Sequence, residues 1–439
     1  MRLKYLSLAA AVTTFSLSSC SFGSNIDNLM TPPKLSVEQE QIYKALTEGN
    51  NTSISLKYPK SGKYLSAFII EDLDGDGGSE AIVFYEHNGI VAEENSLRLN
   101  ILDQENGKWR SIGETSVAGT EIEKVMISKL GTNNRVNIII GSSLINRSEK
   151  NVTVYTYDSE EGTIDSDFSQ AYAFIDVTDL DSDNENEFLL LTGASNSAPA
   201  TASVYELDEN GRYICFPIEL SGSFTEFNSL TYGNIGGGRN GLCIDELSGT
   251  GAIQTDMIYM NDSQLYKVFN TPDEAAATLR PAGYSSADID NDGTIEIPLQ
   301  TIAPGYDNVP ESEQMSITQW KVLNKDNRLV QKYSSYYSVS NGYTFIFPER
   351  WHNNVTVRRD AVNDEIVFCE YSDGEVGEEL MRVFCADDAP SREDRLFNGY
   401  MLMGTKGGTS YLAYIPQHNK NEVPLAPTAG EAAVGFKLI

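Results

Sequence analysis

Asp72-Leu73-Asp74-Gly75-Asp76-Gly77-Gly78-Ser79-Glu80 is a nine-residue acidic segment that occurs in two further versions along the chain. They are Asp179-Leu180-Asp181-Ser182-Asp183-Asn184-Glu185-Asn186-Glu187 and Asp288-Ile289-Asp290-Asn291-Asp292-Gly293-Thr294-Ile295-Glu296. Each version has carboxylates at positions 1, 3, 5 and 9 and a Gly or Asn at position 6. Gly and Asn adopt a left-handed backbone most easily, so position 6 is expected to be left-handed.

This spacing suits a calcium ion. Calcium takes six to eight oxygen ligands, and a tight loop with alternating acids can surround it. We therefore predict three calcium loops with ligands at positions 1, 3, 5, 7 and 9. The expected ligands are Asp72, Asp74, Asp76, Gly78, Glu80, Asp179, Asp181, Asp183, Glu185, Glu187, Asp288, Asp290, Asp292, Thr294 and Glu296. The alternative is an acidic surface turn rich in Asp and Gly.

The flanking residues predict strands rather than helices. An EF-hand carries a bidentate Glu at position 12 between two helices, but position 12 here is Val83, Leu190 and Leu299. Short apolar runs such as 81–85 and 188–191 follow the loops, and runs of this kind between turn residues are typical of buried strands. The arrangement expected is strand–loop–strand.

The loops belong to a longer repeat. They start at residues 72, 179 and 288, and degenerate versions lie halfway between them at 129–137 and 234–242. The degenerate versions keep an apolar second position, Leu130 or Ile235, but have lost the acids, so we expect no metal ligands there. Each unit also contains a later strand–turn–strand segment, as at Asn106-Gly107. Four short strands per unit is the pattern of a propeller blade.

Residues 55–335 thus resemble the FG-GAP repeats, also called VCBS or integrin-alpha-like repeats. The resemblance implies an all-β fold, namely a β-propeller of four-stranded blades with calcium loops between strands. Five repeats are counted, and a strand around 53–58 is expected to complete a blade. With a helix in front, this domain is expected to span residues 36–340.

The first residues are typical of an exported protein. Arg2 and Lys4 precede an apolar stretch from Leu6 to Leu17, which predicts a signal peptide over residues 1–19. Leu17-Ser18-Ser19-Cys20 resembles a bacterial lipobox, which implies lipidation of Cys20, a tether over 20–35 and a membrane-anchored, extracytoplasmic protein. The alternative is an ordinary cleaved signal in which the Cys is incidental.

Two helices and a C-terminal domain complete the expected organisation. Ser36 with Gln39, and Thr271 with Glu274, form capping boxes that predict helices over 37–47 and 272–279. From residue 341 to 439 the acidic loops stop and alternating strand signals continue, which predicts a separate β-rich domain.

The composition argues against nucleic acid as a partner and leaves open whether the cysteines form disulfides. The chain has 63 acidic and 32 basic residues and a formal charge of −31, which argues against nucleic acid. In an oxidising space Cys369 and Cys385 can pair, or each can be a buried thiol. The sequence does not decide this for Cys215 and Cys243 either.

We find no catalytic motif in the sequence. The three histidines, at 87, 352 and 418, lie far apart, and none belongs to a recognisable triad or zinc pattern. We therefore expect a calcium-binding protein of the cell envelope that acts as a binding or scaffold protein, with an unknown protein or glycan ligand. The alternative is a carbohydrate-active enzyme that uses acids at the propeller channel.

Overall fold

The computed structural model describes residues 35–48, 53–88, 96–144, 148–195, 198–222, 224–248, 251–261, 264–417 and 423–439. The predicted signal peptide, Cys20 and all but the last residue of the tether lie outside these ranges. No helix in the described part of the chain is long and apolar enough to cross a membrane.

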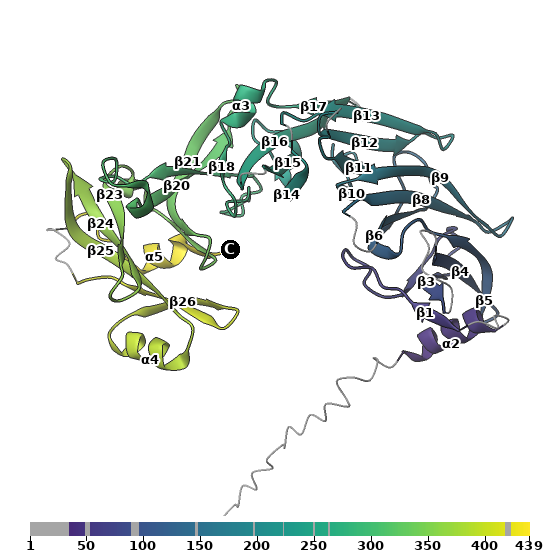
Figure 1. Ribbon diagram of the computed structural model, residues 1–439. Helices are drawn as coiled ribbons and strands as arrows, with labels where there is room; N and C mark the ends of the chain where they lie inside the picture. The colour runs from purple at the N-terminus through teal and green to yellow at the C-terminus, as the bar shows by residue number, and fades with distance from the viewer. Residues whose placement is uncertain are drawn as a thin grey trace, which may run out of the picture.

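The protein is all-β, as predicted, and its described residues form six antiparallel sheets that follow one another along an open arc (Figure 1). In sheets 1 to 4 each strand pairs mainly with the next strand in the chain. Sheet 1 comprises β1 (Ile54–Leu56), β2 (Phe68–Glu71), β3 (Glu80–His87), β4 (Leu97–Glu105) and β5 (Lys108–Ser116). Sheet 2 comprises β6 (Glu121–Ser128), β7 (Asn137–Ser143), β8 (Lys150–Asp158) and β9 (Thr163–Tyr172).

Sheets 3 and 4 continue the pattern. Sheet 3 comprises β10 (Phe174–Thr178), β11 (Glu187–Thr192), β12 (Thr201–Leu207) and β13 (Tyr213–Glu219). Sheet 4 comprises β14 (Glu226–Asn234), β15 (Asn240–Leu247), β16 (Ala252–Asn261), β17 (Gln264–Lys267) and the two-residue β18 (Arg280–Pro281). The short helix α3 (Pro272–Ala276) precedes β18 and is shorter than the predicted 272–279.

Sheets 5 and 6 contain the C-terminal strands. Sheet 5 comprises β19 (Ile297–Ile302), β20 (Ser316–Leu323), β21 (Leu329–Ser338), β22 (Tyr343–Ile346) and β28 (Phe436–Leu438). Sheet 6 comprises β23 (Val355–Asp360), β24 (Glu365–Ser372), β25 (Glu375–Ala386), β26 (Met401–Lys406) and β27 (Thr409–Tyr414). The remaining helices are η1 (Glu311–Glu313), η2 (Glu349–Trp351), α4 (Ala389–Phe397) and α5 (Ala429–Gly435).

The expected domain boundary at residues 340 and 341 falls inside sheet 5. Strand β22 pairs with β21, with Tyr343 opposite Ser338, and β28 then pairs with β22. Sheets 5 and 6 also share one hydrophobic cluster that includes Phe345 and Phe368. The change of composition after residue 340 therefore does not mark a break between separate cores.

Apolar residues on both faces of the middle strands hold neighbouring sheets together. Ile138 and Ile140 on β7 pack with Leu99 of sheet 1, whereas Ile139 between them packs with Leu190 of sheet 3. Side chains alternate between the two faces of a strand, so a strand buried on both faces reads as a continuous apolar run. This is why the sequence shows apolar runs rather than an alternating pattern at these strands.

Helix α2 (Val37–Thr47) covers the outer face of sheet 1. It has the predicted bounds and the predicted Ser36–Gln39 capping box. Ile42 and Leu46 are buried against a cluster that includes Tyr85 and Trp109. In a closed propeller this face would pack against the last blade. Here α2 lies at one end of the arc and α4 at the other, and the ring is open (Figure 1).

The predicted strand around 53–58 forms as β1 and completes a sheet, as expected. Ile54–Leu56 pairs with Tyr85–His87 of β3, and β2 pairs with the other end of the same strand. Strand β1 therefore completes sheet 1. Each of the five repeat units, counted from its loop, contributes the three strands after the loop to one of sheets 1 to 5, and sheet 6 follows. The number of blades in a complete ring stays a prediction.

The four described cysteines are free thiols. Cys369 on β24 lies opposite Glu379, whereas Cys385 on β25 lies opposite Tyr411 on β27. The two thiols are therefore separated along β25, and the alternative of a Cys369–Cys385 disulfide is wrong for this structure.

Candidate metal centres

The three acidic loops fold in the same way. The apolar residue at position 2, Leu73, Leu180 or Ile289, is buried beneath each loop. Its backbone N–H donates to the carboxylate at position 9, at 2.6 Å for Glu80, 2.6 Å for Glu187 and 2.9 Å for Glu296. Each of these three glutamates is almost completely buried. The hydrogen bond therefore fixes the position-9 carboxylate beneath the loop.

The left-handed backbone predicted at position 6 is confirmed at Gly77, Asn184 and Gly293. Position 4 is left-handed as well, at Gly75, Ser182 and Asn291. Ser182 gave no sequence signal for this conformation, because Ser rarely adopts it. The two left-handed residues in each loop curl the backbone around the carboxylates.

Backbone N–H groups of the loop orient the aspartates at positions 1 and 3. In loop 72–80, Asp72 accepts from Gly75 at 2.6 Å and from Gly77 at 3.2 Å, and Asp74 accepts from Asp76 at 3.0 Å. In the other two loops the position-1 aspartate accepts from positions 5 and 6 instead. Asp179 accepts from Asp183 and Asn184, and Asp288 accepts from Asp292 and Gly293. Each aspartate is thus held by the backbone of its own loop.

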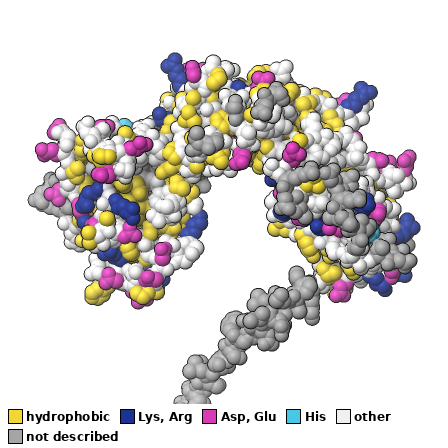
Figure 2. Space-filling model, in the orientation of Figure 1, with side chains coloured by type: hydrophobic (Ala, Val, Ile, Leu, Met, Phe, Trp, Pro, Cys, Tyr) yellow, Lys and Arg dark blue, Asp and Glu magenta, His cyan; other side chains and the backbone are white. Residues whose placement is uncertain are grey.

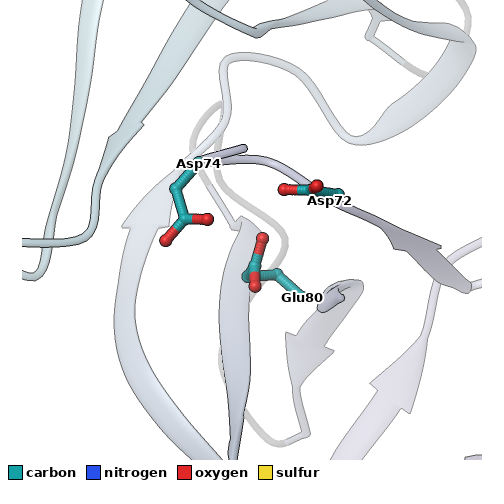
Figure 3. Close-up of side chains that lie close together, drawn as sticks. All are labelled: Asp72, Asp74 and Glu80. Atoms are coloured by element: carbon teal, nitrogen blue, oxygen red, sulfur yellow. The ribbon is translucent and has the colours of Figure 1, made fainter. Parts of the chain in front are cut away.

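Three of the five predicted ligand positions come together in each loop. Oxygen atoms of the residues at positions 1, 3 and 9 all lie within 4.8 Å of one another. Figure 3 shows this arrangement for Asp72, Asp74 and Glu80. The three groups are Asp72, Asp74 and Glu80; Asp179, Asp181 and Glu187; and Asp288, Asp290 and Glu296. Hard carboxylate oxygens in this number fit a calcium ion.

The residues at positions 5 and 7 lie outside these clusters. The carboxylate at position 5 accepts the N–H of position 7, at 2.6 Å for Asp76 and Gly78. The same bond joins Asp183 to Glu185 at 2.7 Å and Asp292 to Thr294 at 2.8 Å. The second oxygen of the position-5 carboxylate takes no part in this bond.

The charged groups that act on Glu80 and Glu187, in loops 72–80 and 179–187, are carboxylates. Burial raises the pKa of Glu187 to about 8, the Leu180 N–H opposes the shift, and the Asp181 and Glu206 carboxylates add to it. The pKa of Glu80 is raised by the same kind of surroundings, with burial first. In the described part of the chain no Lys or Arg forms an ion pair with these two loops. A bound divalent cation would favour the ionised form of these glutamates and so lower their pKa values.

Loop 288–296 differs because an internal cation lies in it. The Lys332 ammonium on β21 is 2.9 Å from Asp290, 2.6 Å from Asp292 and 2.8 Å from Glu296. Burial acts to raise the pKa of Asp290, but hydrogen bonds from Tyr333 and Lys332 outweigh it and lower the pKa overall. The sequence prediction of this loop missed Lys332, which lies far from it in the chain.

The two degenerate loops contain arginines. In 129–137, Arg135 donates to Asn137 at 3.1 Å and pairs with Asp167 at 2.8 Å. In 234–242, Arg239 donates to the Gly236 carbonyl at 3.3 Å. These loops are held together by the protein's own positive charges.

A buried polar cluster in sheet 4 holds the segment that leads into loop 288–296. Arg280 and Asp245 are fully buried and 2.7 Å apart. Asp245 also accepts the Ser286 N–H at 2.7 Å. Beside it lie the buried carboxyls of Glu246 and Asp256. Burial, followed by repulsion from Asp256, raises the pKa of Glu246. The consecutive acids Asp245-Glu246 inside an apolar strand are the sequence signal of this cluster.

A pocket of about 910 Å³ adjoins loop 288–296, and its lining includes Asp290, Tyr333, Phe347, Arg350 and Glu431. Arg350 forms an ion pair with Glu431, and Asp290 one with Lys332. On the face shown in Figure 2, acidic and basic side chains are interspersed over both arms of the arc. The negative excess is therefore not gathered into one patch on that face.

Comparisons with known proteins find distant structural similarity only. No family model and no curated protein matches the sequence. A putative 6-phosphogluconolactonase from Bacteroides fragilis is 13% identical, covers 71% of this chain and 83% of its own, and has a TM-score of 0.27. The rhamnogalacturonan lyase YesW is 11% identical, with coverages of 76% and 73% and a TM-score of 0.30.

The periplasmic gluconolactonase PpgL of Pseudomonas aeruginosa is 11% identical, with coverages of 75% and 88% and a TM-score of 0.29. At such scores these similarities carry no argument about fold or activity. What is established of the chain is its all-β architecture of blade-like antiparallel sheets with three equivalent acidic clusters.

Proposed function

We propose that this protein is a calcium-binding scaffold of the cell envelope, anchored by a lipid on Cys20, which presents its stacked sheets to a protein or glycan. The observation that carries the calcium proposal is the repeated cluster. The same three positions bring carboxylate oxygens within 4.8 Å in each acidic loop, and each position-9 glutamate is buried.

Loops 72–80 and 179–187 suit calcium best. Their clusters contain carboxylates without an internal counter-ion, and like charges held this close repel one another. Asp72, Asp74 and Glu80, or Asp179, Asp181 and Glu187, would hold the ion. A bound calcium ion supplies positive charge and cross-links the loop. Glu80 is the first residue of β3 and Glu187 is the first residue of β11. An ion bound by these glutamates and the loop aspartates would therefore link the loop to the following strand.

The position of the loops favours a structural role for the ion. The two loops lie in sheets 1 and 3 with sheet 2 between them, so their clusters do not meet at one site (Figure 1). A ligand that binds only the folded state must raise the stability of that state. Calcium at these loops is therefore expected to stabilise the stack of sheets.

The pocket beside loop 288–296 favours binding over acid–base catalysis. Two of its carboxylates, Asp290 and Glu431, are engaged in ion pairs with Lys332 and Arg350. A general acid or base must be able to exchange a proton with substrate. Carbohydrate-active catalysis stays the alternative, and activity on glycans that survives removal of all calcium would support it.

Calcium titration of chelator-treated protein tests the proposal. Isothermal titration calorimetry is expected to show binding with a matching rise in melting temperature, and magnesium should compete poorly because it dehydrates reluctantly. Neither heat nor a shift in melting temperature on adding calcium would overturn the calcium proposal. The anchor is tested separately: Cys20→Ala should move the protein out of the membrane fraction, and unchanged membrane association would overturn the lipid anchor.

A further inference from the structure

A β-bulge occurs at the same register in sheets 1, 2 and 5. In each sheet the bulge lies between the second and the third strand after the loop. These strand pairs are β4 and β5, β8 and β9, and β20 and β21. The pairing shifts between Ile101 and Leu102, between Val154 and Tyr155, and between Trp320 and Lys321. Leu102, Tyr155 and Lys321 all lie opposite the residue that follows loop position 9.

The bulge leaves one extra residue on the third strand of each sheet. The extra residues are Ile112 on β5, Asp167 on β9 and Lys332 on β21. A bulge bends its strand and can direct a side chain toward a neighbouring site. These three residues therefore occupy equivalent places relative to the loops of their own sheets.

The extra residue carries the charge that its loop lacks in two of the three sheets. In sheet 5 the loop is acidic, and Lys332 reaches Asp290, Asp292 and Glu296 at 2.6–2.9 Å. In sheet 2 the charges are exchanged, because the loop residue Arg135 pairs with Asp167 at 2.8 Å.

In sheet 1 the extra residue is Ile112, which has no charge to offer. In the described part of the chain no Lys or Arg forms an ion pair with loop 72–80. The identity of the residue at the bulge thus varies together with the charge of the loop. A merely accidental surface ion pair would not follow the register of the sheets.

We propose that Lys332 is the built-in counter-ion of loop 288–296 and takes the place that calcium holds in loops 72–80 and 179–187. An ammonium has three N–H donors, and Lys332 contacts three carboxylates. A metal ion entering this loop must first displace it. The protein then binds two calcium ions rather than three, and sheet 5 is held without metal. The count of two rests on the proposed function; the assignment of Lys332 does not.

Counting bound calcium in wild type and in Lys332→Met tests this. Each protein is equilibrated with calcium, separated from free ion by gel filtration and analysed for metal by mass spectrometry. We expect two ions in wild type and three in Lys332→Met. Lys332→Arg, which keeps the charge, and Lys325→Met, which removes a charge from the exposed turn of the same hairpin, should both retain two.

The outcomes separate this inference from the proposed function. Three ions in wild type, or two in a folded Lys332→Met, would overturn the role of Lys332 and leave calcium binding at the other loops standing. No ion in wild type but one in Lys332→Met would support the role of Lys332 and overturn the proposed function. No ion in either would overturn both.

Terbium gives a second readout of metal entry into this loop. The Tyr333 hydroxyl is 2.6 Å from Asp290, so a terbium ion in loop 288–296 should be excited through that ring. Tyrosine-sensitised emission should be higher in Lys332→Met than in wild type, and this increase should be lost in Lys332→Met with Tyr333→Phe. If Lys332→Met does not fold, Lys332→Gln replaces it in both experiments. The number of calcium ions bound to wild type alone still decides between two ions and three.

Discussion

The backbone N–H of Leu180 donates a 2.6 Å hydrogen bond to the buried carboxylate of Glu187, seven residues further along the chain. This bond closes loop 179–187 over an apolar anchor and fixes one oxygen of the glutamate. The same bond joins Leu73 to Glu80 and Ile289 to Glu296. Because the bond recurs in all three loops, it defines the shared fold of the acidic repeat.

Asp181→Asn is expected to change stability with opposite signs in calcium and in chelator. Burial and the neighbouring Asp183 raise the pKa of Asp181, which means that its charged form is disfavoured without a cation. In chelator the neutral amide should therefore raise the melting temperature. In calcium at a hundred times the dissociation constant, loss of binding should remove up to about 2.7 kcal/mol of stabilisation.

Asp292→Asn, at position 5 of loop 288–296, is the comparison for Asp181→Asn. It removes a partner of Lys332 at 2.6 Å, so it should lower the melting temperature in calcium and in chelator alike. Differential scanning calorimetry under both conditions checks the pair. Equal effects of Asp181→Asn in the two conditions would count against a cation in loop 179–187.

Ile112→Lys should introduce an internal counter-ion into sheet 1. The bulge at Ile112 has the register of the bulge at Lys332, so the new ammonium should reach the carboxylates of loop 72–80. We expect the number of bound calcium ions to fall by one and the calcium-dependent shift in melting temperature to shrink. Thr115→Lys, on the same strand but away from the bulge, should change neither.

Glu246→Gln should reduce the pH dependence of stability. Burial, followed by repulsion from Asp256, raises the pKa of Glu246 from 4.5 to about 9. Between these values the folded state holds a proton that the unfolded state has lost, so the free energy of unfolding falls as pH rises. The slope from one such group is at most about 1.4 kcal/mol per pH unit.

The neutral amide removes this contribution. Urea unfolding at pH 5 and pH 8 should give a smaller difference for Glu246→Gln than for wild type. Glu226→Gln, at an exposed position in the same sheet, serves as the control. An unchanged difference would show that Glu246 is ionised in the folded protein at neutral pH.

Ile42→Ala should destabilise the N-terminal end of the stack. Ile42 is completely buried between α2 and sheet 1, and truncation of a buried Ile costs about 2–5 kcal/mol. Val37→Ala, at an exposed position on the same helix, should cost less than about 0.5 kcal/mol. Urea unfolding of both variants measures the difference, and equal stabilities would mean that α2 does not hold the outer face of sheet 1.

Local signals made part of the structure predictable. The capping box at Ser36 and Gln39 gave the start of α2, because its two residues lie within one turn. The Asp, Gly and Asn spacing of the acidic loops gave their position between strands and the left-handed residue at position 6. In both cases the residues that decide the conformation are close together in the sequence.

Features that depend on distant residues were not predictable in this way. Lys332 reaches Glu296 across 36 residues because of a bulge that has no sequence pattern of its own. Ring closure was expected from the repeat, but α2 covers the face of sheet 1 that closure would use. Likewise, β28 at the C-terminal end of the described chain pairs with β22 and so belongs to sheet 5. This pairing joins residues about 90 positions apart, and no local sequence signal predicts it.

The central claim is that calcium stabilises this fold through loops 72–80 and 179–187. The most direct test is the melting temperature of the chelator-treated protein as calcium is added, measured on wild type, Asp74→Asn, Asp181→Asn and the double variant. We predict a rise in wild type, a smaller rise in each single variant and none in the double variant. A wild-type melting temperature that does not respond to calcium, or a double variant that responds like wild type, would contradict the account.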